Sequence, residues 1–449
     1  MLRANRLIPI FSLGFCAPVL LAVGAFADSQ ARVVRLSDVQ GEVKIDRNTG
    51  AGMEKAFLNL PLTQGAKIDT GNEGRAEVEF EDSGTLRMAP ATVISFTQLS
   101  LKDTGGKVSS IRLQEGTAYI NYLGAKGDEL SLAFGHETIT VSPSTHVRIV
   151  MGDTDASVAI LKGDATLNGA SGSVEVAKDH TVNFDLLDQD KYKLAKGIDP
   201  EPFDDWDKAQ DQYHQRYAAN NAAPSLNSQY AYGTSDLNYY GSWFDAPGYG
   251  SIWQPFLIGA GWNPFLNGAW SFYPGYGYSW VSSYPWGWTP YHSGSWIYLP
   301  TYGWVWQPGN NWSGTSIVNV VNPPATFQRP IAPVAGQKTI PVNNGPMPTQ
   351  LGRSNNRLMI PENSAGLGVP RGGIKNLSDF SRSVQKTGFA NTRVHTEPVA
   401  TQMGWFRSGY STGTRVPGSG ARPMHSMSAP SAHSSGSSGH ASMGGGRVK

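Results

Sequence analysis

The sequence predicts a mainly β protein with two folded domains joined by one helix. Three observations support this prediction. Short strand-like runs follow one another from Ala31 to Phe184, no segment of helical period interrupts them, and a repeat rich in tryptophan and tyrosine follows between Tyr239 and Trp312. At 449 residues the chain is long enough for two or three domains.

The first 27 residues have the features of an export signal. Two arginines precede an apolar run from Leu7 to Phe26, which ends in a small-x-small cleavage motif before Asp28. Cleavage there would remove Cys16, the only cysteine, and leave no disulfide or thiolate metal ligand. We therefore expect a signal peptide at 1–27, an extracytoplasmic location and no membrane span after cleavage. The alternative is an uncleaved N-terminal anchor.

Residues 28–190 are expected to form an all-β domain. Alternation is clearest at Val78 and Phe80, which are separated by acidic residues of an opposite, water-facing side: Glu77, Glu79 and Glu81. Glycine, asparagine and aspartate mark turns between the runs. Many short strands of this kind fit either a β-sandwich or a coiled, solenoid-like stack.

Part of this domain resembles the core motif of FecR-type domains. The motif runs from Gly65 to Gly71 and from Gly74 to Met88, and the similarity extends over about residues 32–185. Later residues that share it are Leu113, Gly116, Thr117, Ala118, Tyr119 and Thr140 to Pro143. The resemblance implies a β-rich extracytoplasmic domain. The namesake of the family passes a ferric-citrate signal from an outer-membrane receptor to a cytoplasmic sigma factor.

A linker helix is predicted at 199–219. Asp199 can cap it, and Pro200 suits its first turn. Five side chains spaced 3, 4, 3 and 4 residues apart form one face that we expect to dock on a neighbouring domain: Phe203, Trp206, Gln210, Tyr213 and Tyr217. The remaining faces carry Asp204, Asp205, Asp207 and Asp211.

Residues 239–313 contain three copies of an aromatic unit. The leading tryptophans, Trp243, Trp270 and Trp296, are 27 and 26 residues apart, and a closing tryptophan keeps the same period. Each unit has two aromatic runs around a glycine turn and so predicts a β-hairpin. Because one hairpin is only marginally stable in water, the three hairpins are expected to converge into one compact β layer. The stretch resembles a tryptophan-rich domain of unknown function that often follows FecR-like domains in secreted bacterial proteins.

Two roles are open for these rings. They can form the core of their own domain, where a buried aromatic side chain contributes roughly 2–3 kcal/mol. Alternatively, exposed rings can stack on sugars or cradle quaternary cations. The candidate ligand-binding rings are Trp243, Trp270, Trp296, Trp286, Trp288 and Tyr291. The stretch has no lysine or arginine, so nucleic acid is not an expected partner.

Residues 322–449 are expected to form a disordered basic tail, because they are rich in proline, glycine and serine. Charge is divided unevenly along the chain. Residues 28–199 have 18 basic and 25 acidic side chains, a net charge of −7, whereas residues 315–449 have 14 basic and 3 acidic, a net charge of +11. The basic segment is therefore expected either to contact something anionic or to be a solvated tail that its charge keeps soluble.

Catalytic motifs are not evident in the sequence. His136, His146 and His180 lie in or beside predicted strands and are expected to be surface or hydrogen-bonded strand histidines. No catalytic residue, cofactor or metal site is expected. The leading hypothesis is a secreted or periplasmic, non-enzymatic cell-envelope protein, a FecR-like scaffold or sensor whose aromatic module binds an envelope polymer or envelope protein. The alternatives are a transmembrane FecR-type regulator anchored by its N-terminal segment, and a secreted glycan-active hydrolase.

Overall fold

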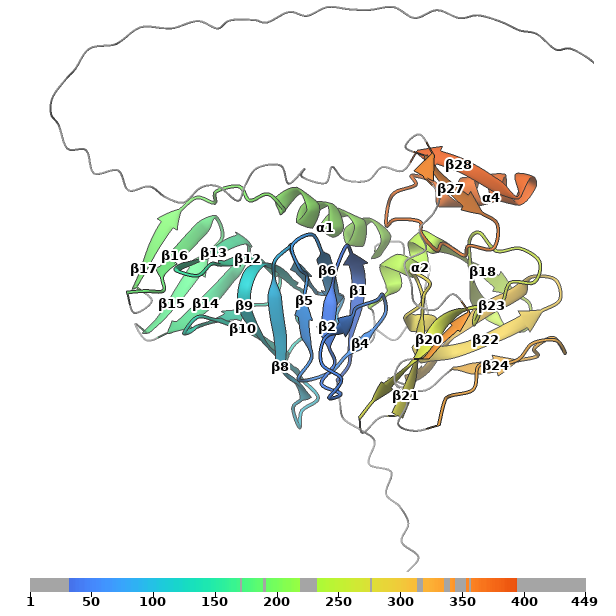
Figure 1. Ribbon diagram of the computed structural model, residues 1–449, viewed down its shortest axis with the longest axis horizontal. Helices are drawn as coiled ribbons and strands as arrows, with labels where there is room; N and C mark the ends of the chain where they lie inside the picture. The colour runs from blue at the N-terminus through green and yellow to red at the C-terminus, as the bar shows by residue number, and fades with distance from the viewer. Residues whose placement is uncertain are drawn as a thin grey trace, which may run out of the picture. The chain divides into compact units, whose positions relative to one another are not determined.

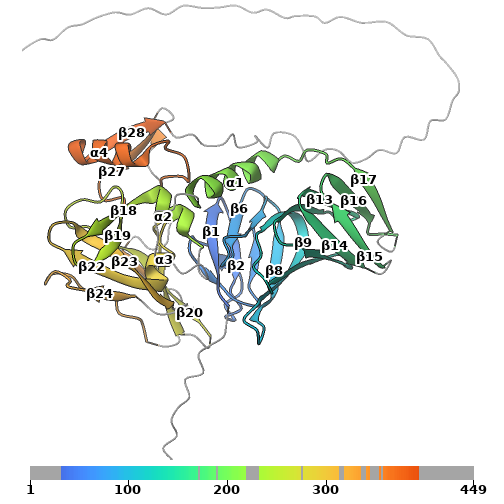
Figure 2. The same ribbon diagram turned by 180° about the vertical axis from the view of Figure 1, so that it is seen from behind.

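The computed structural model describes residues 32–169, 172–188, 191–218, 232–274, 277–312, 318–334, 340–343, 353–354 and 357–393 (Figures 1 and 2). All of them belong to one compact unit, residues 1–400. The expected signal peptide, 1–27, lies outside the described residues. In the described part of the chain, no helix is long and apolar enough to cross a membrane.

The N-terminal domain is a 17-stranded sheet that folds into two layers, here named sheets A and B, which share the long strand β9 (Lys107–Tyr122). In spatial order, sheet A consists of β4 (Pro61–Leu62), β1 (Val34–Gln40), β6 (Arg75–Glu79), β7 (Thr85–Met88), β9, β12 (Thr145–Met151), β13 (Asp155–Lys162), β16 (His180–Asp185) and β17 (Lys191–Lys196). Sheet B consists of β3 (Glu54–Lys55), β2 (Lys44–Asp46), β5 (Lys67–Asp69), β8 (Val93–Leu101), β9, β10 (Glu129–Phe134), β11 (Glu137–Val141), β14 (Asp164–Gly169) and β15 (Gly172–Ala177).

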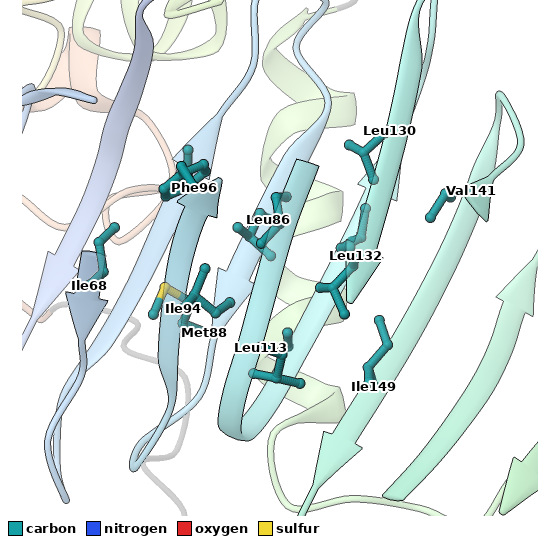
Figure 3. Packing of buried hydrophobic residues seen from close by; sticks show 14 of the residues in the cluster. Ile68, Leu86, Met88, Ile94, Phe96, Leu113, Leu130, Leu132, Val141 and Ile149 are labelled. Carbon is teal, nitrogen blue, oxygen red and sulfur yellow. The ribbon is translucent and has the colours of Figure 1, made fainter. Parts of the chain in front are cut away.

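Both sheets contribute to one apolar core. Alternate residues point inward, among them Leu86 and Met88 of β7 and Ile94 and Phe96 of β8, all of which are fully buried (Figure 3). The chain passes from one sheet to the other in short groups of strands while it advances along the domain. The domain is therefore a sandwich that is wound progressively, which combines the two architectures that the sequence left open. The mainly β prediction is confirmed.

Helix α1 (Asp204–Ala218) packs across the outer face of sheet A (Figures 1 and 2). Its buried aromatic face, with Trp206 and Tyr213, agrees with the predicted spacing. The predicted start of the helix is wrong, because the helix begins at Asp204 and not at residue 199. Asp199 does not cap it, and its backbone carbonyl accepts a hydrogen bond from Arg148. The side chain of Asp204 accepts a bond from the backbone N–H of Glu201, which stabilises the first turn.

The three aromatic units form three β-hairpins with equivalent registers. They are β18 (Gly241–Ala246) with β19 (Gly250–Pro255), β20 (Asn267–Tyr273) with β21 (Gly277–Ser282), and β22 (Ser293–Leu299) with β23 (Gly303–Trp312). In each hairpin the leading and closing tryptophans lie directly opposite one another: Trp243 and Trp253, Trp270 and Trp280, Trp296 and Trp306.

Glycine opens each repeat because the closing tryptophan packs against it. A Cβ atom at Gly241 would lie 2.3 Å from the indole Cζ2 of Trp253, and one at Gly268 would lie 2.4 Å from the indole Cζ2 of Trp280. At Gly294 the indole Nε1 of Trp306 would be 2.9 Å away, but the backbone carbonyl oxygen of Gln307 would be nearer, at 2.2 Å, and the φ of +70° also favours glycine. The repeated Gly-x-Trp pattern thus encodes a close approach of ring to backbone.

The hairpins do not form the single layer expected from the sequence. The first and third share a five-stranded sheet through the pair Trp253–Trp306, and the second belongs to a separate three-stranded sheet. Both sheets nevertheless contribute rings to one aromatic core. The other elements here are α2 (Thr234–Tyr240), α3 (Thr289–His292), β24 (Asn319–Val321) and β25 (Ile340–Asn343).

The prediction of disorder over 322–449 is wrong for residues 357–393. These residues contain β27 (Arg357–Pro361), α4 (Leu377–Thr387) and β28 (Phe389–Arg393), and β27 also pairs with β26 (Arg353–Ser354). Their few apolar side chains pack into the aromatic core, where Ile360, Val369, Leu377 and Val384 are buried. The segment is ordered by a core built elsewhere, so its own composition is a poor guide. Residues 394–449 lie outside the described residues.

Candidate functional site: a buried charge network between the domains

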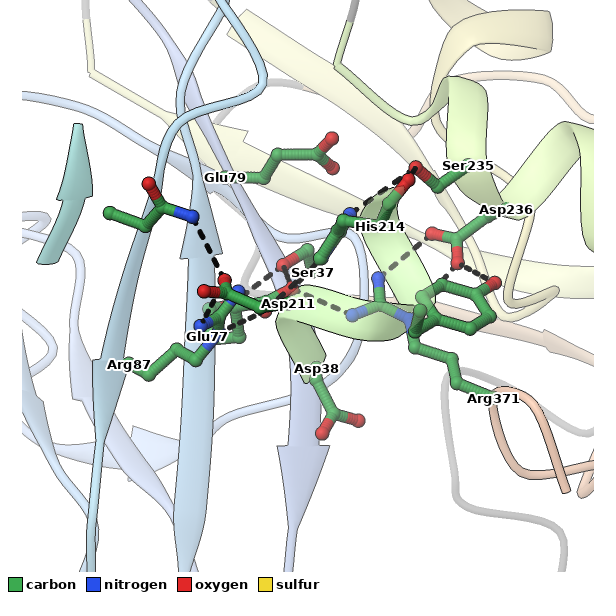
Figure 4. Close-up of polar contacts among 12 residues, drawn as sticks. Ser37, Asp38, Glu77, Glu79, Arg87, Asp211, His214, Ser235, Asp236 and Arg371 are labelled. Carbon is green, nitrogen blue, oxygen red and sulfur yellow. Dashed lines mark hydrogen bonds and ion pairs between the residues drawn. The ribbon is translucent and has the colours of Figure 1, made fainter. Parts of the chain in front are cut away.

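Charged side chains from both domains meet on the outer face of sheet A (Figure 4). Strands β1, β6 and β7 direct their apolar residues into the sandwich and their polar residues to this face: Arg35, Ser37, Glu77, Glu79 and Arg87. The elements that cover the face add further charges, namely Asp207, Asp211 and His214 of α1, Asp236 of α2, and Arg371. Together with His146 of β12, the charged residues in this set are called the charge network below.

The alternation along β6 predicted that its acidic side faces water, and this prediction is wrong. Glu77, Glu79 and Glu81 are 0%, 1% and 4% exposed. The first two are covered by α1, α2 and the segment around Arg371, and Glu81 forms a salt bridge of 2.7 Å with Arg32. Alternation identified the two faces of the strand correctly, but it could not show that a second charged layer covers the outer one.

Arg87 organises one half of the charge network. It lies opposite Glu77 in the β6–β7 register, and its Nε donates to a carboxylate oxygen of Glu77 over 2.8 Å. Its Nη1 lies 2.6 Å from Asp207 and 2.7 Å from Asp211, one turn apart on α1. His146 contacts the second oxygens of the same two aspartates, at 3.0 and 3.3 Å. These contacts hold α1 on the outer face of sheet A.

Arg371 organises the other half. It lies 2.7 Å from Glu77 and 2.8 Å from Asp236, so it joins a strand of the first domain to a helix of the second. Asp236 also contacts Arg35 of β1 at 2.7 Å, and the hydroxyl of Tyr213 donates to it over 2.8 Å. His214 completes this half, with its Nε2 3.0 Å from a carboxylate oxygen of Glu77.

Five carboxylates, three guanidinium groups and two imidazoles make up the charge network. Burial alone would raise the pKa of Glu77, but His214 and Arg371 hold that pKa well below its ordinary value of 4.5. Burial likewise opposes ionisation of Asp236, and Arg371 and Arg35 outweigh it, so the pKa of Asp236 is lowered. For Glu79 burial wins over Arg35, and its pKa is raised. The neighbouring positive charges thus stabilise the ionised forms of Glu77 and Asp236.

His146, Asp207 and Asp211 bring ligand-type atoms within 4.8 Å of one another, the spacing of a metal site. The fit to a metal is poor, because Arg87 already bonds both carboxylates and would be held beside the ion. The donor set is that of an ion-pair network. His146 was expected to be a surface or hydrogen-bonded strand histidine, and the structure places it in contact with carboxylates.

The charge network lies buried between the two domains. Glu77, Arg35, Arg87 and Asp236 are at most 1% exposed, so a substrate could reach them only after the domains separate. Direct hydrogen bonds extend the same interface: Arg35 donates to the carbonyl of Pro285 over 2.8 Å, and Asn59 donates to the carbonyl of Tyr284 over 2.8 Å. Each carboxylate of the charge network already has an arginine partner.

The rings that the sequence selected as ligand-binding candidates are mostly core residues. Trp270, Trp286, Trp288, Tyr291 and Trp296 are between 0% and 4% exposed, so an exposed stacking role is wrong for these five. Several of them pack on one another, as in the stacked pair Trp286–Tyr291 with ring centres 6.1 Å apart. Trp243 alone is half-buried, and its Nε1 donates to Asn238.

Sequence reasoning missed the charge network. Its signals were present in Glu77 and Arg87 on adjacent strands and in two aspartates one helical turn apart on α1. Arg371 had no local signal, because it lies in a segment whose composition predicted disorder. One arginine of the basic segment, Arg371, pairs with carboxylates of this protein.

Two known families match separate parts of the chain, one in the N-terminal sandwich and one in the aromatic hairpins. Residues 66–166 match the family model described as FecR protein, and residues 234–335 match a family of unknown function, DUF6600. The chain contains a FecR domain and a DUF6600 domain. The FecR match runs from β5 to the first half of β14, and the DUF6600 match covers α2 and all three aromatic hairpins. Arg371 lies beyond both matches.

A search of curated proteins finds no match. Among solved structures, two crystal structures of a candidate anti-sigma factor from Parabacteroides distasonis, at 1.65 and 2.50 Å resolution, are similar to part of the chain. In each comparison the sequence identity is 12% and the TM-score 0.26, and the match covers 29% of this chain and 59% of the other.

Proposed function

We propose that this protein is a non-enzymatic, extracytoplasmic regulatory scaffold, in which the FecR domain and the DUF6600 domain respond to a partner as one body. The observation that carries the proposal is the charge network. Glu77 of the FecR domain and Asp236 of the DUF6600 domain share one buried arginine, Arg371. A strain or displacement at either domain changes the partners of that arginine, so the two domains cannot respond independently.

Three features support the remaining parts of the proposal. The FecR match supports a regulatory class, and the signal-like residues 1–27 support export. The burial of the charge network supports a structural role, because its carboxylates are already paired with arginine. Its partner is proposed to be an envelope protein.

The test is complementation in the native host. Transcripts are compared between a strain that lacks the gene and strains that express the wild-type protein, Arg371→Met or Arg382→Met. Arg382 is the matched control, since it is an arginine of α4 whose side chain is 65% exposed. We expect the deletion to change a restricted set of transcripts, and wild type and R382M to restore it. R371M should fail at equal protein abundance.

Two outcomes would contradict the proposal. An unchanged transcript profile in the deletion strain would remove the regulatory role. Full restoration by R371M would show that coupling of the domains through Arg371 is unnecessary. Determination of the mature N-terminus tests the location separately, with Asp28 as the expected first residue.

Binding of an envelope polymer is a second candidate function, favoured by one exposed aromatic pair. Tyr302 is 40% exposed, and its ring centre lies 5.1 Å from that of the half-buried Phe244. Such a pair can stack on a sugar. The test is sedimentation of the purified protein with insoluble peptidoglycan: Tyr302→Ala should lower the bound fraction, whereas Phe389→Ala, at another exposed aromatic ring, should not. Equal binding of the two variants would exclude this aromatic pair.

A further inference from the structure

The far end of the FecR-domain sandwich differs from its middle, because its inward-facing side chains are uncovered. On β16, Val182 and Phe184 are 0% and 3% exposed. Their register partners on β17, Leu194 and Tyr192, are 46% and 42% exposed. Leu187, just before β17, is 77% exposed. The apolar layer of the sandwich therefore continues to this end without a covering element.

The same strand presents an open backbone edge. Among the described residues, β17 (Lys191–Lys196) pairs only with β16, so the N–H and C=O groups on its second edge have no strand beside them. Figure 1 shows β17 at the left-hand end of the sandwich, and Figure 2 shows it at the opposite end from β1. The FecR family match ends at residue 166, before this strand. The edge is thus a feature of this chain outside the matched core.

Lysines give this edge a positive charge. Three of the six residues of β17 are Lys191, Lys193 and Lys196, and the strand has no acidic residue. Lys191 contacts Asp188 at 2.6 Å. Within the described structure, no ion pair involves Lys193 or Lys196. Lys191 and Lys193 lie on the outward face of sheet A, since their register partners Asp185 and Asn183 alternate with core residues.

We propose that β17 is a docking edge for an extended acidic segment of another protein, which adds to sheet A as one further strand. Main-chain hydrogen bonds would pair the segment with β17, and alternate side chains would give it specificity. Its apolar residues would cover Tyr192 and Leu194, and its acidic residues would face Lys191 and Lys193. The chemistry of the edge therefore selects a segment in which acidic and apolar residues alternate.

Two other segments could in principle pair with β17, namely a second copy of this chain and the chain's own C-terminal residues, and charge argues against both. A second copy of this chain would bring one set of three lysines against another, and like charges directly opposite on paired strands are destabilising. The chain's own residues 394–449 contain five lysines and arginines and one acidic residue, so they too would be repelled. The site is separate from the charge network, so failure of this proposal leaves the proposed regulatory function intact.

The test uses the full-length protein and a synthetic peptide that alternates glutamate with valine, and the control peptide has lysine in place of glutamate. We expect saturable binding of the glutamate peptide only, with slower amide hydrogen exchange confined to β17. The variant K191E/K193E/K196E should lose at least about tenfold in affinity for the glutamate peptide and gain affinity for the lysine peptide. Reversal of the preference is a readout that misfolding would not produce.

Leu194→Asp tests the apolar part, and Leu101→Asp is its control, at a leucine of β8 that is 38% exposed. Only L194D should lower the affinity of the protein for the glutamate peptide. Equal binding of both peptides, or protection outside β17, would overturn the proposal. So would self-association through β17, which assigns the edge to a second copy. The absence of binding would also overturn it, and the lysines would then serve only to keep the edge from pairing.

Discussion

Arg371 and Glu77 are separated by 294 residues in the sequence, yet Nη1 of the arginine lies 2.7 Å from Oε1 of the glutamate. The arginine side chain is 8% exposed and the glutamate side chain 0%. The contact links the segment after the DUF6600 match to a central strand of the FecR domain. Because Arg371 bonds Asp236 as well, the network that it completes cannot form in either domain alone.

Replacement of Arg371 by methionine should destabilise the protein by about 3–5 kcal/mol, because Glu77 and Asp236 would then be buried without their shared cation. The measurement is equilibrium unfolding in urea at neutral pH. Arg382→Met is the control and should cost less than about 1 kcal/mol, since the Arg382–Asp379 pair is exposed. A similar loss in both variants would mean that the Arg371 contacts contribute no more than a surface pair.

Glu77 and Glu79 should influence acid stability in opposite directions. The pKa of Glu77 is held well below 4.5, so its contribution is complete above pH 4.5 and is lost as the pH falls through the folded-state value. The pKa of Glu79 is raised by burial, so its ionisation costs stability at neutral pH, and that cost disappears as the pH falls through the raised value.

This difference can be measured by comparing Glu77→Gln and Glu79→Gln with wild type in urea unfolding from pH 7 to pH 3. The stability gap between wild type and E77Q should narrow toward acid. The free energy of unfolding of wild type minus that of E79Q should increase toward acid, because only wild type gains stability from protonation of Glu79. Parallel curves for the two variants would contradict the assigned pKa directions.

Much of the fold could be predicted from local patterns. Alternation at Val78 and Phe80 located a strand, and the 26 to 27 residue period located three hairpins whose tryptophans pair as the repeat implies. These features are encoded by neighbours in sequence. The spacing of Trp206 and Tyr213 identified the buried face of α1 for the same reason.

The site could not be predicted, because its residues are brought together only by tertiary structure. Glu77 has the pattern of a solvent-facing residue and becomes buried only when α1 and Arg371 cover it. The rings of Trp286 and Trp288 could not be assigned as buried or exposed from composition alone. Their burial depends on how two separate sheets share one core.

Metal ions should leave the stability of the protein unchanged. His146, Asp207 and Asp211 have the spacing of ligands, but Arg87 occupies both carboxylates. We expect the same melting temperature with EDTA, with zinc and with manganese. A saturable rise with either metal that disappears in His146→Ala would contradict this prediction. The substitution His136→Ala, in the turn just before strand β11, controls for nonspecific binding by histidine.

The glycine that opens each aromatic repeat should tolerate no methyl group. Gly241→Ala should cost about 1–3 kcal/mol, since its Cβ would lie 2.3 Å from the indole of Trp253. The backbone is not the cause, because Gly241 has a φ of −155°, which any residue adopts. Gly250→Ala is the contrasting variant. At that position there is open space but a φ of +71°, so the cost is backbone strain alone.

Two measurements separate these causes. Near-ultraviolet circular dichroism should change in G241A, because the ring of Trp253 must shift, and should remain the same in G250A. A Cβ atom at residue 241 would also lie 2.5 Å from the backbone carbonyl oxygen of Gln254. In a double-mutant cycle, Trp253→Phe removes the ring clash and leaves this backbone clash, so G241A should cost about 1 kcal/mol less in that background and should still destabilise. G250A should cost the same in both backgrounds. If the cost of G241A does not depend on residue 253, contact between ring and backbone does not explain why each repeat begins with glycine.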